Sequence, residues 1–317
     1  MSTKLEGVAE YIEHYPWPPL SAANYTRSYR LLGPRSADAD TSNVAYAIVQ
    51  TDNGNVLTIA RADVVAKTLT RFIASDTPFA GLVYNGTAMF WDADETGIII
   101  IDARAGQATR LVYRVDVGTG EVTSLPSVTS VDGDAGWENF FAGARVDSTK
   151  AILYSRNSSR WKYYNYGTGT ISWATDFNTL PMAGCPVIVG GRAYYQLGVG
   201  NLNVGTIVSQ PISGIGRQRR RGECCTHQNV AVTTAAPGSP IPKFNFGYES
   251  GPIVSIGVDP DAQHIYFPTS DNKVLCSDGT NITTLVSGHR WTEQAVFIKA
   301  ANRLVGCSNG GNLLVIS

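Results

Sequence analysis

Apolar and polar residues alternate over much of the chain, in short runs that are separated by Gly, Asn and Asp residues. In the stretch YRVDVGTGEVTSLPS, residues 113–127, every second residue from Tyr113 to Val117 is apolar, and a GTG turn follows. Alternation with a period of two is typical of a half-buried strand. The stretch therefore predicts a β-hairpin, and the first question is whether this hairpin occurs once or repeats.

The hairpin pattern recurs along the chain. The segments KYYNYGTGTISWA and VLCSDGTNITTLV share its layout of an apolar strand, a glycine-containing turn and a second strand. The dipeptides Asn53-Gly54 and Asn85-Gly86 between apolar runs are further hairpin signals, because both residue types tolerate positive φ. Clear units of short strands lie at 44–76, 78–127, 137–177, 182–230 and 250–288. A last unit, 292–317, is shorter and lacks one strand.

Four-stranded units that recur every roughly 40 to 50 residues are typical of β-propellers. We therefore expect an all-β fold, a β-propeller of about six four-stranded blades, with five or seven blades as alternatives. A small sheet cannot bury both faces alone, and stacking the sheets around an axis covers those faces. We expect the segment YTRSYRLLG, residues 25–33, to supply the missing strand of the last blade. A pair of β-sandwiches is the main alternative, but it does not explain the recurring unit length.

The ends of this pattern define the domain organisation. Residues 1–43 are predicted to form an extended N-terminal arm, because the prolines of YPWPPL disfavour a regular helix. Residues 44–317 would form the propeller, with an irregular insertion at 211–250. The arm either wraps the surface or docks onto a neighbour, since aromatic rings are costly to leave in water. Its candidate partner-binding residues are Tyr11, Tyr15 and Trp17.

Composition limits the partners and the environment. The net charge is −1 and only 16% of the residues are charged, so no overall field draws the protein to nucleic acid or acidic lipid. The longest apolar run, residues 97–101, is too short to span a membrane. The N-terminal sequence lacks the pattern of a signal peptide, so we expect synthesis in the cytoplasm. Five cysteines without framework spacing favour reduced thiols over a disulfide scaffold.

The insertion at 211–250 carries the densest group of basic and sulfur-containing side chains. The arginines of RQRRRG suit a phosphate, an acidic partner or a neighbouring subunit, or they form a solvated loop. No aromatic residues flank the run for base stacking, which argues against nucleic acid. The adjacent cysteines of ECCTHQ rarely converge on one metal ion, so an intermolecular disulfide or free thiols are expected. The partner-binding candidates are Arg217, Arg219, Arg220 and Arg221, and the candidate intermolecular thiols are Cys224 and Cys225.

Motifs for catalysis or metal binding are weak. The turn DADETG, residues 92–97, resembles the start of a calcium loop, but Ala103 stands where such a loop needs a bidentate glutamate. The segment SVDGDAGW, residues 130–137, resembles the aspartate box of sialidase-type propellers, with Asp134 in place of a glycine. The four histidines lie outside the common catalytic motifs. We therefore predict no enzyme activity, no catalytic residue, no metal site and no cofactor.

The repeats resemble kelch-like and quinoprotein-like propellers in general layout, without the in-register Trp and Gly positions of those families. The combination of degenerate blades over 44–317, few charges and a terminal arm is similar to the propeller proteins of bacteriophage tails. That resemblance implies a non-catalytic structural or adaptor protein of a large assembly, a virion tail nozzle, hub or fibre-attachment ring. Its partners would be other protein subunits, including copies of itself in a homo-oligomeric ring.

Two other functions stay open on the sequence. The 6 tryptophans and 15 tyrosines suit a propeller that binds or cleaves carbohydrate, with a host surface glycan as partner. An intracellular scaffold of the WD or kelch kind would instead bind peptides on one face. Under the assembly hypothesis, truncation of residues 1–20 is expected to abolish incorporation and to leave the propeller folded.

Overall fold

The structure is a computed structural model of the 317-residue chain. Within the ranges that it describes, the chain forms β-strands and one short 3₁₀ helix, Ser36–Asp38. The predicted all-β fold is therefore confirmed. The described residues are 4–12, 25–51, 57–73, 87–102, 109–129, 140–155, 160–174, 182–189, 192–197, 204–205, 207–211, 244–245, 256–259, 264–269, 272–277, 282–289, 291, 295–308 and 312–317.

The N-terminal half forms three four-stranded antiparallel sheets in which strand order follows chain order. The first sheet contains β2 (Tyr25–Leu32), β3 (Val44–Thr51), β4 (Leu57–Asp63) and β5 (Thr68–Arg71). The second sheet contains β6 (Ala88–Trp91), β7 (Gly97–Ile101), β8 (Thr109–Asp116) and β9 (Val122–Thr129). The third sheet contains β10 (Phe140–Arg145), β11 (Lys150–Ser155), β12 (Arg160–Asn165) and β13 (Thr170–Trp173).

The C-terminal half continues the series. The fourth sheet has three described strands, β14 (Met182–Val189), β15 (Arg192–Leu197) and β17 (Ile207–Pro211). A separate short pair joins β16 (Val204–Gly205) to β18 (Phe244–Asn245). The fifth sheet contains β19 (Gly257–Val258), β20 (Ile265–Pro268), β21 (Lys273–Ser277) and β22 (Ile282–Ser287). The last sheet contains β23 (Ala295–Ile298), β24 (Arg303–Cys307), β25 (Leu313–Ile316) and β1 (Ala9–Ile12).

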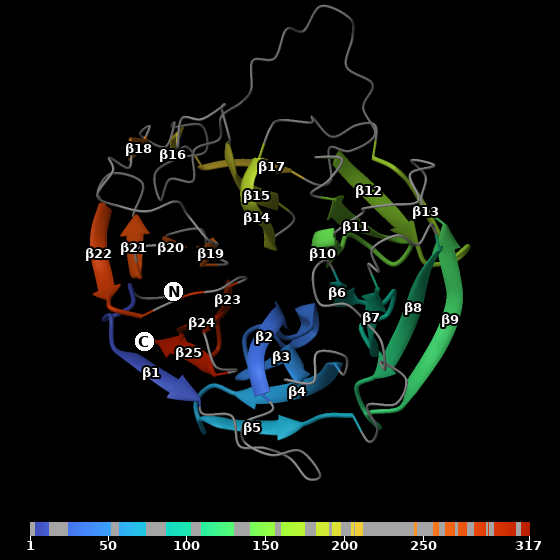
Figure 1. The fold of residues 1–317 in the computed structure, drawn as a ribbon, viewed down its shortest axis with the longest axis horizontal. Helices are drawn as coiled ribbons and strands as arrows, with labels where there is room; N and C mark the ends of the chain where they lie inside the picture. The colour runs from blue at the N-terminus through green and yellow to red at the C-terminus, as the bar shows by residue number, and fades with distance from the viewer. Residues whose placement is uncertain are drawn as a thin grey trace, which may run out of the picture.

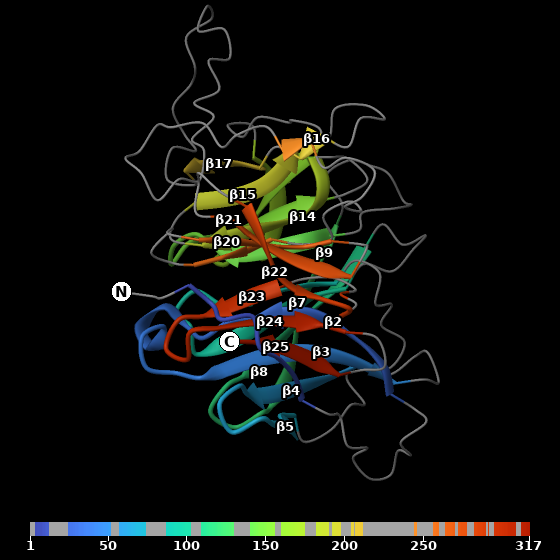
Figure 2. The same ribbon diagram turned by 90° about the vertical axis from the view of Figure 1, so that its left-hand side faces the viewer.

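These sheets lie around a common centre (Figure 1). Their first strands contact one another in the order β2, β6, β10, β14, β19 and β23, and β23 contacts β2 again. Figure 2 shows β23, β24 and β25 layered beside β2 and β3. Among the described residues, buried apolar clusters join the last sheet to the first, the first to the second, the second to the third, the fourth to the fifth and the fifth to the last, as where Ile59 of β4 packs with Ile98 and Ile100 of β7. Each sheet therefore buries at least one face against a neighbour, which a single small sheet cannot do.

The place of a strand in its sheet explains its sequence pattern. β7 is the second strand of its sheet and is buried on both faces, with Ile98 to Ile101 all at most 2% exposed. β8 is third and alternates between buried and more exposed residues, while β9 at the outer edge is mostly exposed. A continuous apolar run is typical of a strand covered on both sides, and alternation is typical of a half-covered one.

The hairpin at residues 113–127 is formed by β8 and β9. Its turn closes with a hydrogen bond of 2.8 Å from Gly120 N to Asp116 O. The turn after β12 has the same bond, from Gly169 N to Asn165 O at 2.8 Å, and the two glycines have φ of +72° and +63°. A glycine with positive φ at the end of a short hairpin loop suits a G1 bulge. The predicted repetition is thus confirmed for these two hairpins.

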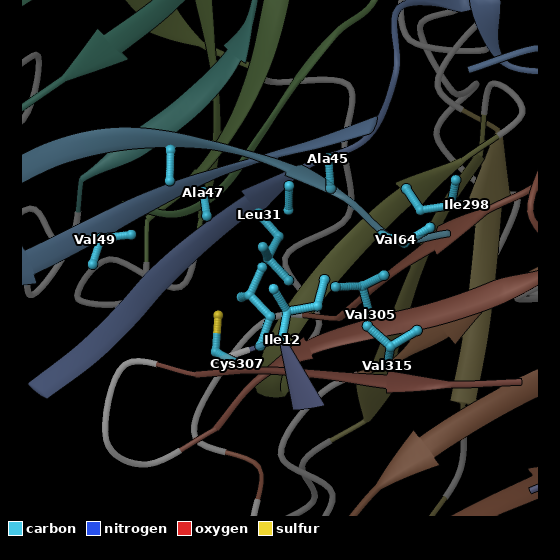
Figure 3. Packing of buried hydrophobic residues seen from close by; sticks show 13 residues of the cluster. Ile12, Leu31, Ala45, Ala47, Val49, Val64, Ile298, Val305, Cys307 and Val315 are labelled. Atoms are coloured by element: carbon cyan, nitrogen blue, oxygen red, sulfur yellow. The ribbon is translucent and has the colours of Figure 1, made fainter. Parts of the chain in front are cut away.

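The N-terminal segment departs from the predicted arm. Residues 25–32 form β2, which pairs with β3 and begins the first sheet, so the prediction that this segment completes the last blade is wrong. β1 takes that place, with Ala9–Ile12 antiparallel to Leu313–Ile316 of β25. The physical reason is burial, because Ile12 packs with Leu31 in a cluster between the first and last sheets (Figure 3).

Several other predicted features lie outside the described residues. They include Asn53-Gly54, Asn85-Gly86 and the turn of the third hairpin segment. Of the insertion at 211–250, only Pro211 and the strand Phe244–Asn245 are described. Among the residues that the structure describes, no helix is long and apolar enough to cross a membrane.

Candidate functional site

One end of the first three sheets forms a continuous surface of turns. In an antiparallel sheet, the turn from the first to the second strand lies at the same end as the turn from the third to the fourth. We call the surface built by these turns the turn face. Its turns are residues 33–43, 64–67, 92–96, 117–121, 146–149 and 166–169.

Aspartate side chains hold the backbone of four of these turns. Asp63 Oδ1 accepts hydrogen bonds of 3.0 and 2.8 Å from the N–H groups two and three residues later. Asp116 Oδ1 accepts two such bonds of 2.9 Å each, and Asp147 Oδ1 accepts two of 2.7 and 3.1 Å. Asp94 Oδ1 accepts one of 3.1 Å from the N–H two residues later. These are Asx turns, which fix the local backbone before any tertiary contact forms.

Hydrogen bonds between sheets then join the turns to one another. Trp91 Nε1, at the end of β6, donates to Gly33 O of the first sheet at 3.3 Å. Tyr166 Oη of the third sheet donates to Trp91 O at 2.7 Å. Arg145 Nε, also of the third sheet, donates to Ala93 O at 3.0 Å. The turns of three consecutive sheets therefore hold one another in fixed relative positions.

An arginine organises the turns of the second sheet. Arg114 Nε donates to Asp92 Oδ2 at 2.8 Å, and Arg114 Nη2 donates to Thr96 Oγ1 at 2.7 Å. Arg114 Nη1 reaches Asp116 Oδ2 at 3.4 Å. A Cβ at Gly97 would lie 2.6 Å from both the guanidinium carbon and Asp92 Oδ2, so a larger residue there would displace this ion pair. Arg114 thus links the turn after β6 to the turn after β8.

Beside this network, a pocket of about 410 Å³ opens between the first and second sheets. Tyr46 and Trp91 supply its aromatic wall, and their ring centroids are 5.6 Å apart in an edge-to-face arrangement. Three carboxylates also line it, those of Asp38, Glu95 and Asp116. The volume lies within the range of sites that hold a small ligand or one large side chain.

The charge of the pocket lining is negative. Among the described residues that line it, Arg35 is the only basic one, and Arg35 Nε donates to Asp38 Oδ2. Three carboxylates against one guanidinium leave a net charge of −2 among the lining side chains. Glu95 Oε1 and Oε2 accept hydrogen bonds of 2.6 and 3.1 Å from the hydroxyl and N–H of Ser36, and Arg145 Nη1 lies 3.9 Å from Glu95 Oε1.

Glu95 has an unusual backbone. Its φ of +59° lies in the left-handed region, which costs a non-glycine residue about 1–2 kcal/mol. The bonds from Ser36 hold the side chain across the boundary between two sheets. Lys67, Asn272 and Asn302 also have positive φ at turns, so this conformation belongs to the turn, and the contact with Ser36 is what places Glu95 at the pocket.

The carboxylates around Arg114 differ in their acidity. Burial raises the pKa of Asp92, against the opposing effect of its hydrogen bonds to Gly97 and Arg114. Hydrogen bonds from the Thr96 hydroxyl and N–H lower the pKa of Asp94 to about 2. Hydrogen bonds from Thr119 likewise lower the pKa of Asp116. At neutral pH the carboxyl groups of Asp94 and Asp116 are therefore ionised.

Replacement of Asp94 by Asn is expected to reduce stability at neutral pH and to leave it unchanged in strong acid. A carboxylate with a depressed pKa stabilises the folded state above its ordinary pKa of 3.8 and loses that contribution as the pH falls toward 2. The difference in urea midpoint between wild type and Asp94→Asn should be constant above about pH 5 and should shrink below it. Midpoints measured at a series of pH values test this; a difference that stays constant down to pH 2 would contradict it.

The structure tests few of the predicted site residues. Tyr11 lies on β1 with 41% of its surface exposed, and its Oη is 2.8 Å from His289 Nδ1. It therefore contacts this chain and still presents part of its ring to solvent. The other candidates lie outside the described residues and stay predictions: Tyr15, Trp17, Arg217, Arg219, Arg220, Arg221, Cys224 and Cys225.

The acidic turn at residues 92–97 has a structural explanation. Asp92 pairs with Arg114, and Asp94 holds the N–H and hydroxyl of Thr96. Across the described part of the chain, no group of three His, Cys, Asp or Glu side chains could hold a metal ion. Ala103 and the segment 130–137 lie outside the described residues.

Sequence reasoning missed the pocket. Its lining comes from three separate segments, 34–46, 91–96 and 116–118, which only the packing of the first sheet on the second brings together. The available signal was the series of aspartates at turns, Asp63, Asp94, Asp116 and Asp147, each with Val, Thr or Gly two residues later, on one end of consecutive sheets. That signal indicates the turn face but not the position of the pocket on it.

Comparison with known proteins places the fold. No protein-family model matches the chain, and no curated protein matches its sequence. A structural genomics protein of unknown function from Bacteroides thetaiotaomicron superposes with a TM-score of 0.56 at 12% identity, over 98% of this chain and 75% of that one. An auxiliary nutrient binding protein from the same organism gives a TM-score of 0.52 at 12% identity, over 93% of this chain and 69% of that one.

A third similar structure is described as a β-propeller. The β-propeller domain of Cps50 (Swd1) from Myceliophteria thermophila superposes with a TM-score of 0.51 at 9% identity, over 92% of this chain and 96% of the domain. The predicted propeller-like all-β fold is thus confirmed. At these identities the likeness concerns the fold alone. None of these three descriptions concerns a bacteriophage tail, so the phage resemblance stays a prediction.

Proposed function

We propose that this protein is a non-catalytic scaffold that binds another polypeptide through its turn face, as a structural or adaptor component of a large assembly. The observation that carries the proposal is the turn face itself. Hydrogen bonds between sheets hold its turns in place, and a pocket with aromatic and charged walls opens in it. Rigid surfaces with Trp, Tyr and Arg around a pocket are typical of protein interaction sites.

The polar groups of the pocket favour binding over catalysis. The carboxylate of Asp116 holds backbone N–H groups of its own turn, and that of Glu95 holds Ser36. Ser42 Oγ accepts a hydrogen bond from Val44 N at 3.2 Å, which is a turn contact. These groups act as supports of the backbone, whereas a general base needs a partner that orients it toward a substrate.

The finer proposal is a virion protein of a bacteriophage tail, forming a nozzle, hub or fibre-attachment ring. It rests on the resemblance in sequence style and on the low charge content of the chain. We also infer that the six sheets are the blades of a six-bladed propeller. The cyclic contacts of β2, β6, β10, β14, β19 and β23 support this count.

A pair of matched variants tests the function. Gly118 and Gly167 occupy the same position in the equivalent turns after β8 and β12, but only Gly118 lines the pocket. Gly118→Trp should fill the pocket, and Gly167→Trp should not, because a side chain at Gly167 meets open space. Particles purified from a host that produces each variant are analysed by quantitative mass spectrometry.

Wild type and Gly167→Trp should enter particles at a fixed ratio to the other subunits, and Gly118→Trp should enter at a clearly lower ratio. Absence of all three from particles would overturn the assembly proposal. Equal incorporation of all three would show that the pocket is not the contact.

Carbohydrate binding is a second candidate function. The specific observation in its favour is the combination of Tyr46 and Trp91 with three carboxylates in one pocket of about 410 Å³. Aromatic surfaces pack against sugar rings, and carboxylates accept hydrogen bonds from hydroxyl groups. A glycan array probed with wild type and Gly118→Trp separates the two candidate functions. Glycan binding by wild type that the substitution abolishes would favour carbohydrate binding. No glycan binding by wild type would exclude it.

A further inference from the structure

We propose that the pocket between the first and second sheets binds an arginine side chain of a partner polypeptide. The inference rests on the proposed function as a polypeptide-binding scaffold and names the chemistry that the scaffold recognises. The pocket residues that carry the argument are Asp38, Glu95, Asp116, Tyr46 and Trp91.

Charge is the first reason. Among the described residues, the lining carries three carboxylates and one guanidinium, a net charge of −2. Around it, Arg114 pairs with Asp92 and Asp116, Arg145 lies near Glu95, and the charge of Arg61 acts on Tyr46. When Asp92 and Asp94 are also counted, the wider group has five carboxylates against four guanidinium groups, a net charge of −1. The side-chain exposed fractions of Asp38 and Asp116 are 37% and 34%, so their charge reaches the solvent-filled space. A cationic ligand would restore neutrality there.

Geometry is the second reason, and it favours arginine over a compact cation. Each carboxylate oxygen can accept two hydrogen bonds, and Asp38 accepts from the single donor Arg35 through Oδ2 within the described residues. A guanidinium has five donors in a planar fork, so it can bridge carboxylates on different turns. The edge-to-face pair of Tyr46 and Trp91 offers apolar surface to the alkyl stem of such a side chain.

The third reason is that hydrogen bonds fix the positions of two pocket carboxylates. Asp116 is fixed by the backbone of its own turn, and Glu95 is fixed by Ser36 of the neighbouring sheet. Both acceptors are thus in place before a ligand arrives, which lowers the entropy that binding would otherwise cost. Glu95 keeps this place despite its left-handed φ of +59°.

The experiment uses a peptide from this chain as its first probe. GIGRQRRRGE, residues 214–223, contains four arginines, and nona-arginine is the second probe. A third peptide replaces each arginine of the first by citrulline, which has nearly the same shape and no charge. Titration calorimetry at about 0.15 M salt, where exposed charges are largely screened beyond ~8 Å, measures each affinity for the full chain.

The variants separate the pocket from general acidity. Asp116→Asn removes one pocket charge and keeps a side-chain oxygen that can accept the N–H bonds of the turn, and Asn165 occupies the equivalent position in the turn after β12. Asp63→Asn is the matched control, because Asp63 holds its turn in the same way and lies outside the pocket lining. Unfolding midpoints of both variants establish that the fold is kept. Asp116→Asn should weaken arginine-peptide binding at least about tenfold, the value of one charge-assisted hydrogen bond.

Binding that Asp116→Asn weakens and Asp63→Asn does not, with no binding of the citrulline peptide, is the expected result. Equal loss in both variants, equal binding of the citrulline peptide, or no binding of either arginine probe would overturn the proposal. Concentration-dependent dimers of wild type that Asp116→Asn dissolves would identify the arginines of a second copy as the source. If the arginine probes fail while Gly118→Trp still blocks assembly, the scaffold function stands and only the arginine assignment falls.

Discussion

Removal of residues 1–12 should destabilise the whole fold rather than release a dispensable arm. The segment contains β1, which completes the last sheet by pairing with β25. Leu5 and Ile12 are 2% and 1% exposed, in the clusters that join the last sheet to the fifth and to the first. Burial of two such side chains contributes about 3–6 kcal/mol, which is a large share of the usual 5–15 kcal/mol of a folded domain.

The truncation also uncovers the edge of β25. Leu313–Ile316 is a run of apolar residues whose unpaired backbone would then face solvent. Exposed apolar edges of this kind associate with other strands, so the truncated chain should aggregate as well as unfold at a lower urea concentration.

Two point variants control this prediction. Ile12→Ala should lose about 2–5 kcal/mol of unfolding free energy, as buried Ile to Ala changes do. Val8→Ala, at a residue 51% exposed just before β1, should change it by less than about 0.5 kcal/mol. Urea unfolding followed by tryptophan fluorescence measures all three proteins. A truncated chain with the wild-type midpoint would show that β1 is not part of the cooperative fold.

This prediction replaces the expectation that truncation of residues 1–20 leaves the propeller folded. A loss of assembly in the truncated protein would follow from unfolding alone. The docking hypothesis for the arm is therefore better tested by Tyr15→Ser and Trp17→Ser, which leave residues 4–12 intact.

The sequence was most informative where local pattern and final environment agree. The apolar run at 97–101 predicts a strand covered on both faces, and β7 is such a strand. The GTG turn at residues 118–120 predicts a hairpin because its glycines tolerate positive φ, and Gly120 has a positive φ. In both cases the determining interactions lie within a few residues of each other.

The sequence was least informative where distant segments meet. AEYI at 9–12 is too short to indicate a strand by itself, and it is stabilised by pairing with residues at the opposite end of the chain. The sequence around Glu95 predicts neither its contact with Ser36 nor its left-handed backbone conformation. The pocket needs three segments at once, so no local pattern could place it.

The apolar pattern also does not show that Gly306 lies in close contact with a distant aromatic ring. Gly306 lies within β24, where glycine is otherwise unfavourable, since it packs no side chain and loses more entropy on folding. A Cβ at this position would lie 1.3 Å from Cζ3 and 1.9 Å from Cε3 of Trp291, a side chain that is 3% exposed. The indole ring thus packs directly on the strand backbone.

Gly306→Ala should therefore lower the free energy of unfolding by about 3 kcal/mol or more, the upper range for an overpacked core. The added methyl group cannot fit unless the Trp291 ring moves, and that ring is packed in the cluster between the fifth and last sheets. Gly167→Ala is the matched control, because its Cβ would meet open space, and it should change stability by less than about 0.5 kcal/mol.

A double-mutant cycle identifies the clash as the cause. Trp291→Leu is itself destabilising, since it removes buried aromatic surface, but it also removes the ring atoms that the new methyl group would meet. Gly306→Ala should then cost less than about 1 kcal/mol in the Trp291→Leu background, which gives a coupling energy of about 2 kcal/mol, within the range for contacting residues. Additive losses in urea unfolding would mean that the ring does not pack on Gly306, and that the last sheet meets the fifth sheet by a different arrangement.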